Sequence, residues 1–191
     1  MAKRDSSQFL QGLTVQEATN AVIPKLIKVT PTVTAADNAD NDVIFDWTEI
    51  PGASRAPGLG VMLQSIALLD SNDNGPGSVV IDIVFCRGSI SGGTSAAPTT
   101  AQQLGAADAV VDITKAEMKA VEICGHVNMT STEGDLILGS TVTSSNIGLV
   151  MQPHPDSTSL YVAGVWRFNP ADMSAAGALT TGLDFYFGFV G

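Results

Sequence analysis

The residues best suited to metal binding are two histidines and two cysteines. Cys124 and His126 lie two positions apart in ICGHV, a run typical of a strand, so their side chains should share one face. A zinc site would need two more ligands, but Cys86 is the only further soft ligand, and His154 lies between two prolines. We therefore predict no metal site and place His126 in the core or at an interface. Both cysteines lie in apolar runs, which favours reduced, buried thiols, with a bridge between them left open.

Two acidic turns partly match calcium-binding loops. Asp70–Gly75 (DSNDNG) has the opening pattern and the glycine of such a loop, but Ile81 stands where the bidentate glutamate is due. Asn38–Asp42 has oxygen-bearing side chains at alternate positions and Glu49 at the twelfth place, but it lacks the glycine. We interpret both as turns whose Asx side chains bond their own backbone. Calcium binding at Asp70–Gly75 stays open.

Catalytic motifs are missing from the sequence. There is no G-x-S-x-G nucleophile elbow, and Gly58-Leu59-Gly60 precedes a predicted strand rather than a helix, so it cannot direct helix amides at a phosphate. Asp82 and Asp184 interrupt strands and are the best candidates for a glycosidase carboxylate pair, but we expect both on the solvent side of a sheet. We predict a protein that is not an enzyme, with no catalytic residues and no cofactor.

The elements that position these residues are mainly β-strands. Runs rich in β-branched and aromatic residues alternate with turns marked by glycine and proline. About eight strands are expected, at Lys25–Thr34, Val43–Trp47, Val61–Leu69, Val79–Cys86, Glu122–Asn128, Asn146–Met151, Ser159–Phe168 and Leu183–Val190. One short helix should follow Thr114, which forms a capping box with Glu117. Since strands do not alternate with long helices, we predict an all-β, antiparallel two-sheet sandwich that is jelly-roll-like, with an immunoglobulin-like topology as competitor.

Three local features of this sandwich are also predicted. In Val43–Trp47, the first, third and fifth residues (Val, Phe and Trp) should share one face. The turn-rich DSNDNGPG between Val61–Leu69 and Val79–Cys86 indicates that these two strands form a hairpin. The small, polar and glycine-rich Gly88–Ala107 is typical of a long surface loop.

Composition and charge bound the function. The 191 residues are 45% hydrophobic and 15% charged, which fits one folded domain, residues 25–191, preceded by an N-terminal arm, residues 1–24. The formal net charge of −10 argues against binding to nucleic acid or to an anionic membrane surface. No apolar run is long enough to span a bilayer, and no secretory signal is recognisable, so we expect synthesis in a cytoplasm.

The order of segments from Ile27 to Val190 resembles a family of head decoration or cement-like virion proteins of tailed bacteriophages. Five pieces carry the resemblance: VTPTV (29–33), GVMLQSIALLD (60–70), VVIDIVF (79–85), DITKAEMKAVEICGHV (112–127) and the C-terminal series NIGLVM, SLYVAGVWR and ALTTGLDFYFGFV (146–151, 159–167, 178–190). The arm and the loop Gly88–Ala107 are particular to this sequence.

The resemblance implies a jelly-roll-like domain on the capsid exterior, bound to the major capsid protein as a homotrimer at three-fold or quasi-three-fold positions. It supplies no catalytic residues. The apolar face of Phe185, Phe187 and Phe189 is one candidate for the trimer interface, although the same pattern fits the sandwich core. A lectin-like jelly roll that attaches the virion to host glycans is the alternative.

Overall fold

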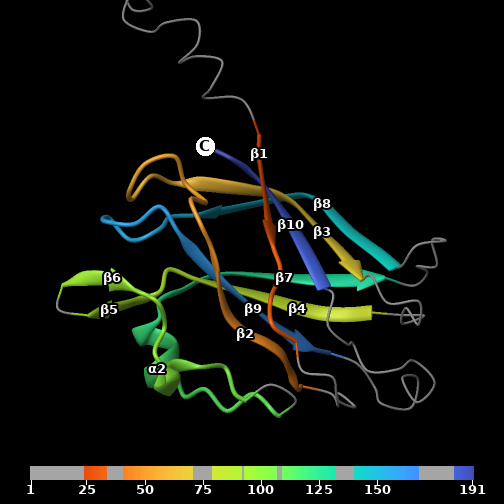
Figure 1. Cartoon of the computed structure of the whole chain (residues 1–191), viewed down its shortest axis with the longest axis horizontal. Helices are drawn as coiled ribbons and strands as arrows, with labels where there is room; N and C mark the ends of the chain where they lie inside the picture. The colour runs from red at the N-terminus through yellow and green to blue at the C-terminus, as the bar shows by residue number, and fades with distance from the viewer. Residues whose placement is uncertain are drawn as a thin grey trace, which may run out of the picture.

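The computed structural model describes residues 24–33, 41–70, 79–91, 93–106, 109–131, 140–167 and 183–191. These residues form an all-β sandwich of two four-stranded antiparallel sheets (Figure 1). In spatial order the first sheet contains β1 (Lys25–Val29), β10 (Leu183–Val190), β3 (Val61–Asp70) and β8 (Ser140–Met151). The second contains β2 (Val43–Ile50), β9 (Leu160–Trp166), β4 (Val79–Cys86) and β7 (Ile123–Ser131). Between β4 and β7 lie β5 (Ser89–Ser91), β6 (Thr94–Ala96), the 3-10 helix η2 (Thr100–Gln102) and the helix α2 (Lys115–Ala120).

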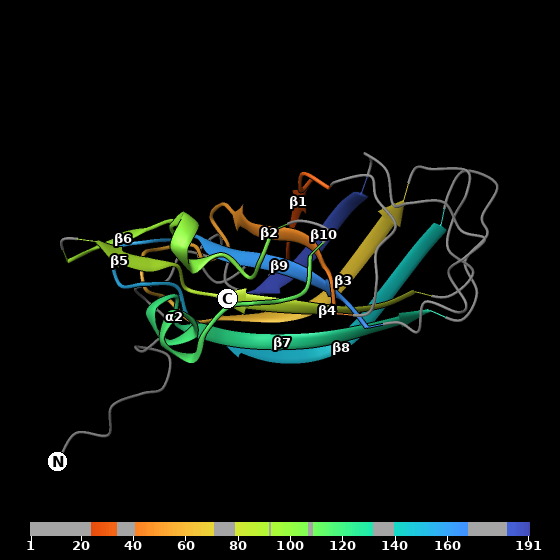
Figure 2. The ribbon, with the colours of Figure 1, turned by 90° about the horizontal axis from the view of Figure 1, so that it is seen from below.

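The strand pairing is that of a jelly roll. Four antiparallel pairs are nested within one another: β1 with β10, β2 with β9, β3 with β8 and β4 with β7. Two further antiparallel pairs, β10 with β3 and β9 with β4, join these into the two sheets. A long hairpin rolled around itself produces this arrangement, which confirms the predicted jelly-roll-like sandwich over the immunoglobulin-like alternative. Figure 2 shows β7 and β8 side by side where the two sheets meet at one edge.

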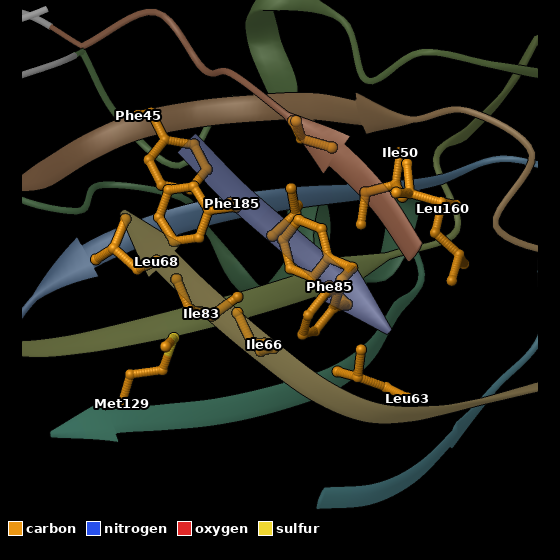
Figure 3. Close-up of a cluster of buried hydrophobic side chains, with 14 of the residues drawn as sticks. Phe45, Ile50, Leu63, Ile66, Leu68, Ile83, Phe85, Met129, Leu160 and Phe185 are labelled. Atoms are coloured by element: carbon orange, nitrogen blue, oxygen red, sulfur yellow. The ribbon is translucent and has the colours of Figure 1, made fainter. Parts of the chain in front are cut away.

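The core lies between the sheets and is rich in phenylalanine. Phe185, Phe187 and Phe189 of β10 are at most 1% exposed, because alternate residues of the strand point inward. The ring of Phe185 faces that of Phe45 from β2, with 5.1 Å between centroids (Figure 3), and Phe187 meets Phe85 from β4 edge-on at 5.8 Å. Such contacts add to the free energy gained by burial. The three β10 phenylalanines therefore belong to the core, as one of the two interpretations of their pattern predicted, and they are not available for a trimer interface.

The predicted hairpin between β3 and β4 is also wrong. β3 pairs with β10 and β8, whereas β4 pairs with β9 and β7, so the chain crosses from one sheet to the other after Asp70. A cluster of turn residues predicts that the chain reverses, but it does not specify the sheet to which the chain returns. Most of DSNDNGPG, residues 71–78, lies outside the described residues, as do residues 1–23 of the predicted arm.

The predicted face of β2 is wrong because irregularities interrupt its alternation. Its register with β9 shifts twice, between Val43 and Phe45 and between Phe45 and Thr48. As a result, neighbouring Ile44 and Phe45 both join the main core, while Val43 and Trp47 contact clusters on the outward side of the sheet. One extra residue in a strand thus moves every following side chain to the opposite face.

The segment between β4 and β7 is more ordered than the long surface loop predicted for Gly88–Ala107. It contains the β5–β6 hairpin and η2, and Figures 1 and 2 both place this hairpin at the same end of the sandwich as α2. The predicted capping box of α2 is confirmed. The Thr114 hydroxyl accepts a hydrogen bond from the Glu117 amide at 3.3 Å, and the Glu117 carboxylate accepts one from the Thr114 amide at 2.7 Å.

Candidate interaction surface

The outward side of the first sheet carries a group of apolar side chains, which we call the open face. Because these residues alternate with core residues along each strand, they point away from the sandwich. Val190, Met62 and Val150 lie beside one another across β10, β3 and β8. The apolar members are Leu26, Met62, Ala67, Leu69, Val150, Tyr186 and Val190. None of the three hydrophobic clusters of described residues lies over this face.

The open face has no net charge. Its described charged side chains are Lys28 and Asp184, whose Nζ and Oδ2 atoms are 2.8 Å apart, and the Thr30 hydroxyl donates to Asp184 at 2.5 Å. The hydrogen bond to Asp184 raises the pKa of Lys28. Desolvation on its own would raise the pKa of Asp184, but the hydrogen bonds from Lys28 and Thr30 outweigh desolvation, so the pKa of Asp184 is lowered. Both groups are therefore ionised at neutral pH and their charges cancel. The Nζ atom of Lys28 also lies 5.9 Å from the ring centroid of Tyr186.

The outward side of the second sheet is different because the chain covers part of it. Two small hydrophobic clusters form there from β2, β9, the end of β4 and the segment between β4 and β7. Their members are Val43, Leu104, Ile113, Ala163 and Val165 in one, and Cys86, Val121 and Tyr161 in the other, with Trp47 packed against both. The Trp47 indole donates to the Gln102 carbonyl at 2.8 Å, which ties η2 to this side of the sheet.

Asp82 lies at the centre of a polar network on the β4–β7 half of the same outward side. It lies on the outward side of the sheet, as expected, but it is only 7% exposed because neighbouring side chains contact it there. The Asn128 amide donates to Asp82 at 2.8 Å, His126 Nε2 lies 3.0 Å from the same carboxylate, and Arg167 Nε donates to its other oxygen. Burial on its own would raise the pKa of Asp82, but these bonds outweigh it and hold the pKa below its usual value.

We expect Asp82→Asn to lower the free energy of unfolding by about 1–2 kcal/mol at pH 7, because Arg167 and Asn128 lose a charged acceptor. Because the pKa of Asp82 is lower in the folded protein than in the unfolded chain, its charge stabilises the fold at pH values above the unfolded pKa, which is near 4. This stabilisation is lost as the pH falls through the folded pKa. The difference between wild type and variant should therefore be constant from pH 5 to 8 and shrink below about pH 4. Denaturant unfolding across this range, in a His126→Gln background that removes the imidazole beside Asp82, tests it. A difference that persists at low pH would contradict an ionic role for Asp82.

The arrangement of Cys124 and His126 differs from the predicted one. β4 and β7 pair Phe85 with Gly125 and Cys86 with Ile123, so Cys124 is the extra residue of a bulge. Cys124 packs against the main core, whereas His126 contacts Asp82 on the outward side. Both thiols are free, and burial raises the pKa of each, to about 11 for Cys124. Within the described part of the chain, no group of three or more His, Cys, Asp and Glu residues could hold a metal ion.

The other candidate residues have local structural contacts. His154 Nδ1 lies 2.6 Å from Asp156 Oδ1, and the other Asp156 oxygen accepts from the Ser95 amide at 2.8 Å, which links β6 to the segment before β9. Glu49, predicted as the twelfth residue of a calcium loop, accepts a hydrogen bond from Ser159 at 2.6 Å. Residues 71–75 and 38–40 of the two calcium-like turns lie outside the described residues.

A polar surface pocket of about 280 Å³ lies between η2 and α2. Its lining includes hydroxyl, amide and carboxylate groups from Thr100, Gln103, Thr114, Asp112 and Glu117. Two of these groups already bond each other, since Thr114 and Glu117 form the capping box of α2. The pocket can offer hydrogen bonds to a small polar ligand, but it has no aromatic wall.

Sequence reasoning missed both the open face and this pocket. The open face could have been recognised in β3, where three of the outward positions, Met62, Ala67 and Leu69, are apolar. The pocket depends on the folding of a segment that was expected to be a loop. None of the described helices is long and apolar enough to cross a membrane. Comparison of the sequence with protein-family models and with curated proteins finds no match.

Proposed function

We propose that this protein is a structural virion protein, a decoration or cement protein that binds and stabilises the assembled head of a tailed bacteriophage. Its partners are the major capsid protein and further copies of itself, in a homotrimer on the capsid exterior. The ordered resemblance of residues 27–190 supports this role. The jelly-roll sandwich is compatible with it, but this fold serves many functions and does not identify one.

The observation that carries the proposal is a set of exposed apolar side chains on a sheet face without net charge, in a strongly acidic protein. Leu26 and Val150 of the open face are 67% and 70% exposed, although the chain as a whole has a net charge of −10. Exposed apolar patches on a folded domain are typical of protein–protein contacts. The net negative charge keeps the free protein soluble and away from nucleic acid and anionic lipid.

Stabilisation of a head follows from binding in many copies. A ligand that binds the assembled lattice and not its dissociated subunits stabilises the assembly by mass action. Because several copies are linked in one oligomer, each contact with the shell can be weak while the whole remains attached. The shell surface that meets this protein should be neutral or basic, since a second acidic surface would repel it.

The proposal predicts that purified virions contain this chain at a copy number comparable with that of the major capsid protein. Quantitative mass spectrometry of purified particles, with the major capsid protein as internal reference, measures this ratio. As a control, particles produced without the gene should regain the protein when it is added back, and should then resist heat or chelator treatment better. Near-absence of the chain from virions would overturn the proposal.

We expect deletion of residues 1–24 to leave the sandwich folded but to weaken its retention on heads. The first described strand begins at Lys25, so no described pairing of the sandwich is removed. Co-sedimentation of the shortened protein with heads that lack it measures retention, and far-ultraviolet circular dichroism checks the fold. Unchanged occupancy of the heads would show that the arm makes no contact with the shell.

A lectin-like role is the second candidate, and the polar pocket between η2 and α2 favours it. Hydroxyl, amide and carboxylate groups such as those of Thr100, Gln103 and Asp112 can hydrogen-bond sugar hydroxyls. A glycan array probed with the purified protein tests this role, with Asp112→Asn as the pocket variant. Binding that is abolished by this variant would support the second candidate, and silence of the array would exclude it.

A further inference from the structure

We infer that the open face turns toward the three-fold axis of a homotrimer, with the Leu26 edge of one copy against the Val150 edge of the next. This inference rests on the proposed function for the number of copies. It adds the surface and the residues through which the copies meet.

The first step is the position of the two most exposed side chains of the open face. Leu26 lies on β1 and Val150 on β8, and these strands are the two edges of the first sheet. A contact that joins opposite edges uses two different surfaces of the same molecule. Such head-to-tail contacts close into a ring when the rotation between copies allows it.

The second step is electrostatic. Two copies that each carry a net charge of −10 repel one another unless they meet through a surface without net charge. The open face meets this condition because Lys28 and Asp184 form an ion pair with each other. The β8 edge, from Ser140 to Met151, has no charged residue, so it does not repel the β1 edge of a second copy.

The third step concerns the shape of the β8 edge. Asn146 and Gly148 have positive φ values of 57° and 67°, and three residues of β8 stand opposite the single residue Gln64 of β3. Bulges of this kind interrupt an edge, so that it cannot continue a sheet by backbone pairing. A second copy therefore cannot add a strand at this edge, but it can contact the exposed side chain of Val150.

The experiment compares charge insertions at the two edges with a matched control. Native mass spectrometry and analytical ultracentrifugation of the full chain should show a trimer for wild type. Leu26→Glu and Val150→Glu should each raise the trimer dissociation constant about thirtyfold or more. The control Val110→Glu, at a side chain 61% exposed outside the open face, should leave the trimer intact. Circular dichroism verifies that every variant is folded.

Disulfide trapping tests the pairing of opposite edges. The double variant Leu26→Cys/Val150→Cys should give cross-linked dimers and trimers under mild oxidation, whereas each single variant should not, because its cysteine meets no copy of itself. The native thiols compete little, since Cys86 is buried and the pKa of Cys124 is raised to about 11.

A monomeric or dimeric wild type, or cross-linking of the single variants, would overturn the inference. So would a trimer that is insensitive to both glutamate insertions. These measurements use the isolated protein, whereas the proposed function is tested on virions. A trimer that never occurs on heads would refute the function alone, and a virion protein with a charge-insensitive trimer would refute this inference alone.

Discussion

Phe187→Ala is expected to lower the free energy of unfolding by about 3–5 kcal/mol, the range for removing a fully buried aromatic side chain. Phe187 is completely buried in the middle strand pair of the first sheet, and its ring contacts Phe85 from the opposite sheet and both neighbouring phenylalanines of β10. Truncation leaves a cavity that stiff aromatic neighbours cannot fill. A loss of this size is a large fraction of the stability of a single domain.

Guanidinium unfolding at a fixed protein concentration measures this effect, since dissociation of an oligomer would otherwise change the midpoint. Val110→Ala provides the control, because its side chain is 61% exposed and its loss should change stability by less than about 0.5 kcal/mol. Equal effects of the two substitutions would mean that the phenylalanine row does not form the core.

Gly164→Ala is expected to cost about 1–3 kcal/mol through overpacking. Gly164 of β9 pairs with Phe45 of β2, and a methyl group at Gly164 would lie about 3.0 Å from ring atoms of that phenylalanine, with one ring atom still closer. The ring cannot move away easily, because it is fully buried and packs against Phe185. The glycine therefore makes room for the aromatic side chain.

A double-mutant cycle with Phe45→Leu separates this contact from a general effect of alanine in a strand. If the ring is the obstacle, the double variant should lose less stability than the sum of the two single variants. Gly60→Ala, just before β3, is the control without a clash, since the nearest atom to its added methyl group, the Met151 carbonyl oxygen, is 3.9 Å away. Strict additivity in the cycle would contradict the proposed clash.

The sequence predicted the strands well wherever one face is apolar and the run is short. β4 and β10 have the predicted bounds, because alternating apolar residues and flanking turn residues both mark their ends. β8 is longer than the predicted Asn146–Met151, since its first half is a serine and threonine run whose pairing with β3 is a tertiary effect. β1 ends at Val29, short of the predicted Thr34, close to the proline that cannot donate to a ladder.

The candidate surface could be predicted only in part. The sequence alone shows that Met62, Ala67 and Leu69 of β3 are apolar. Whether these side chains are exposed depends on which segment of the chain covers which sheet. Described residues between β4 and β7 cover part of the second sheet, and no local pattern in that segment specifies this choice. The error for Cys124 and His126 has a similar origin, because a bulge cannot be recognised without the partner strand.

The nested pairing has a consequence for how the protein forms in the cell. Lys25 pairs with Phe189, near the last residue of the chain, and β10 lies between β1 and β3. The first sheet therefore cannot close until β10 has been synthesised. Chains with such a high contact order fold slowly, and their apolar strands stay exposed for longer to chaperones and to aggregation. Without β10, β1 has no described neighbour in its sheet, so translation that stops before β10 should produce insoluble protein.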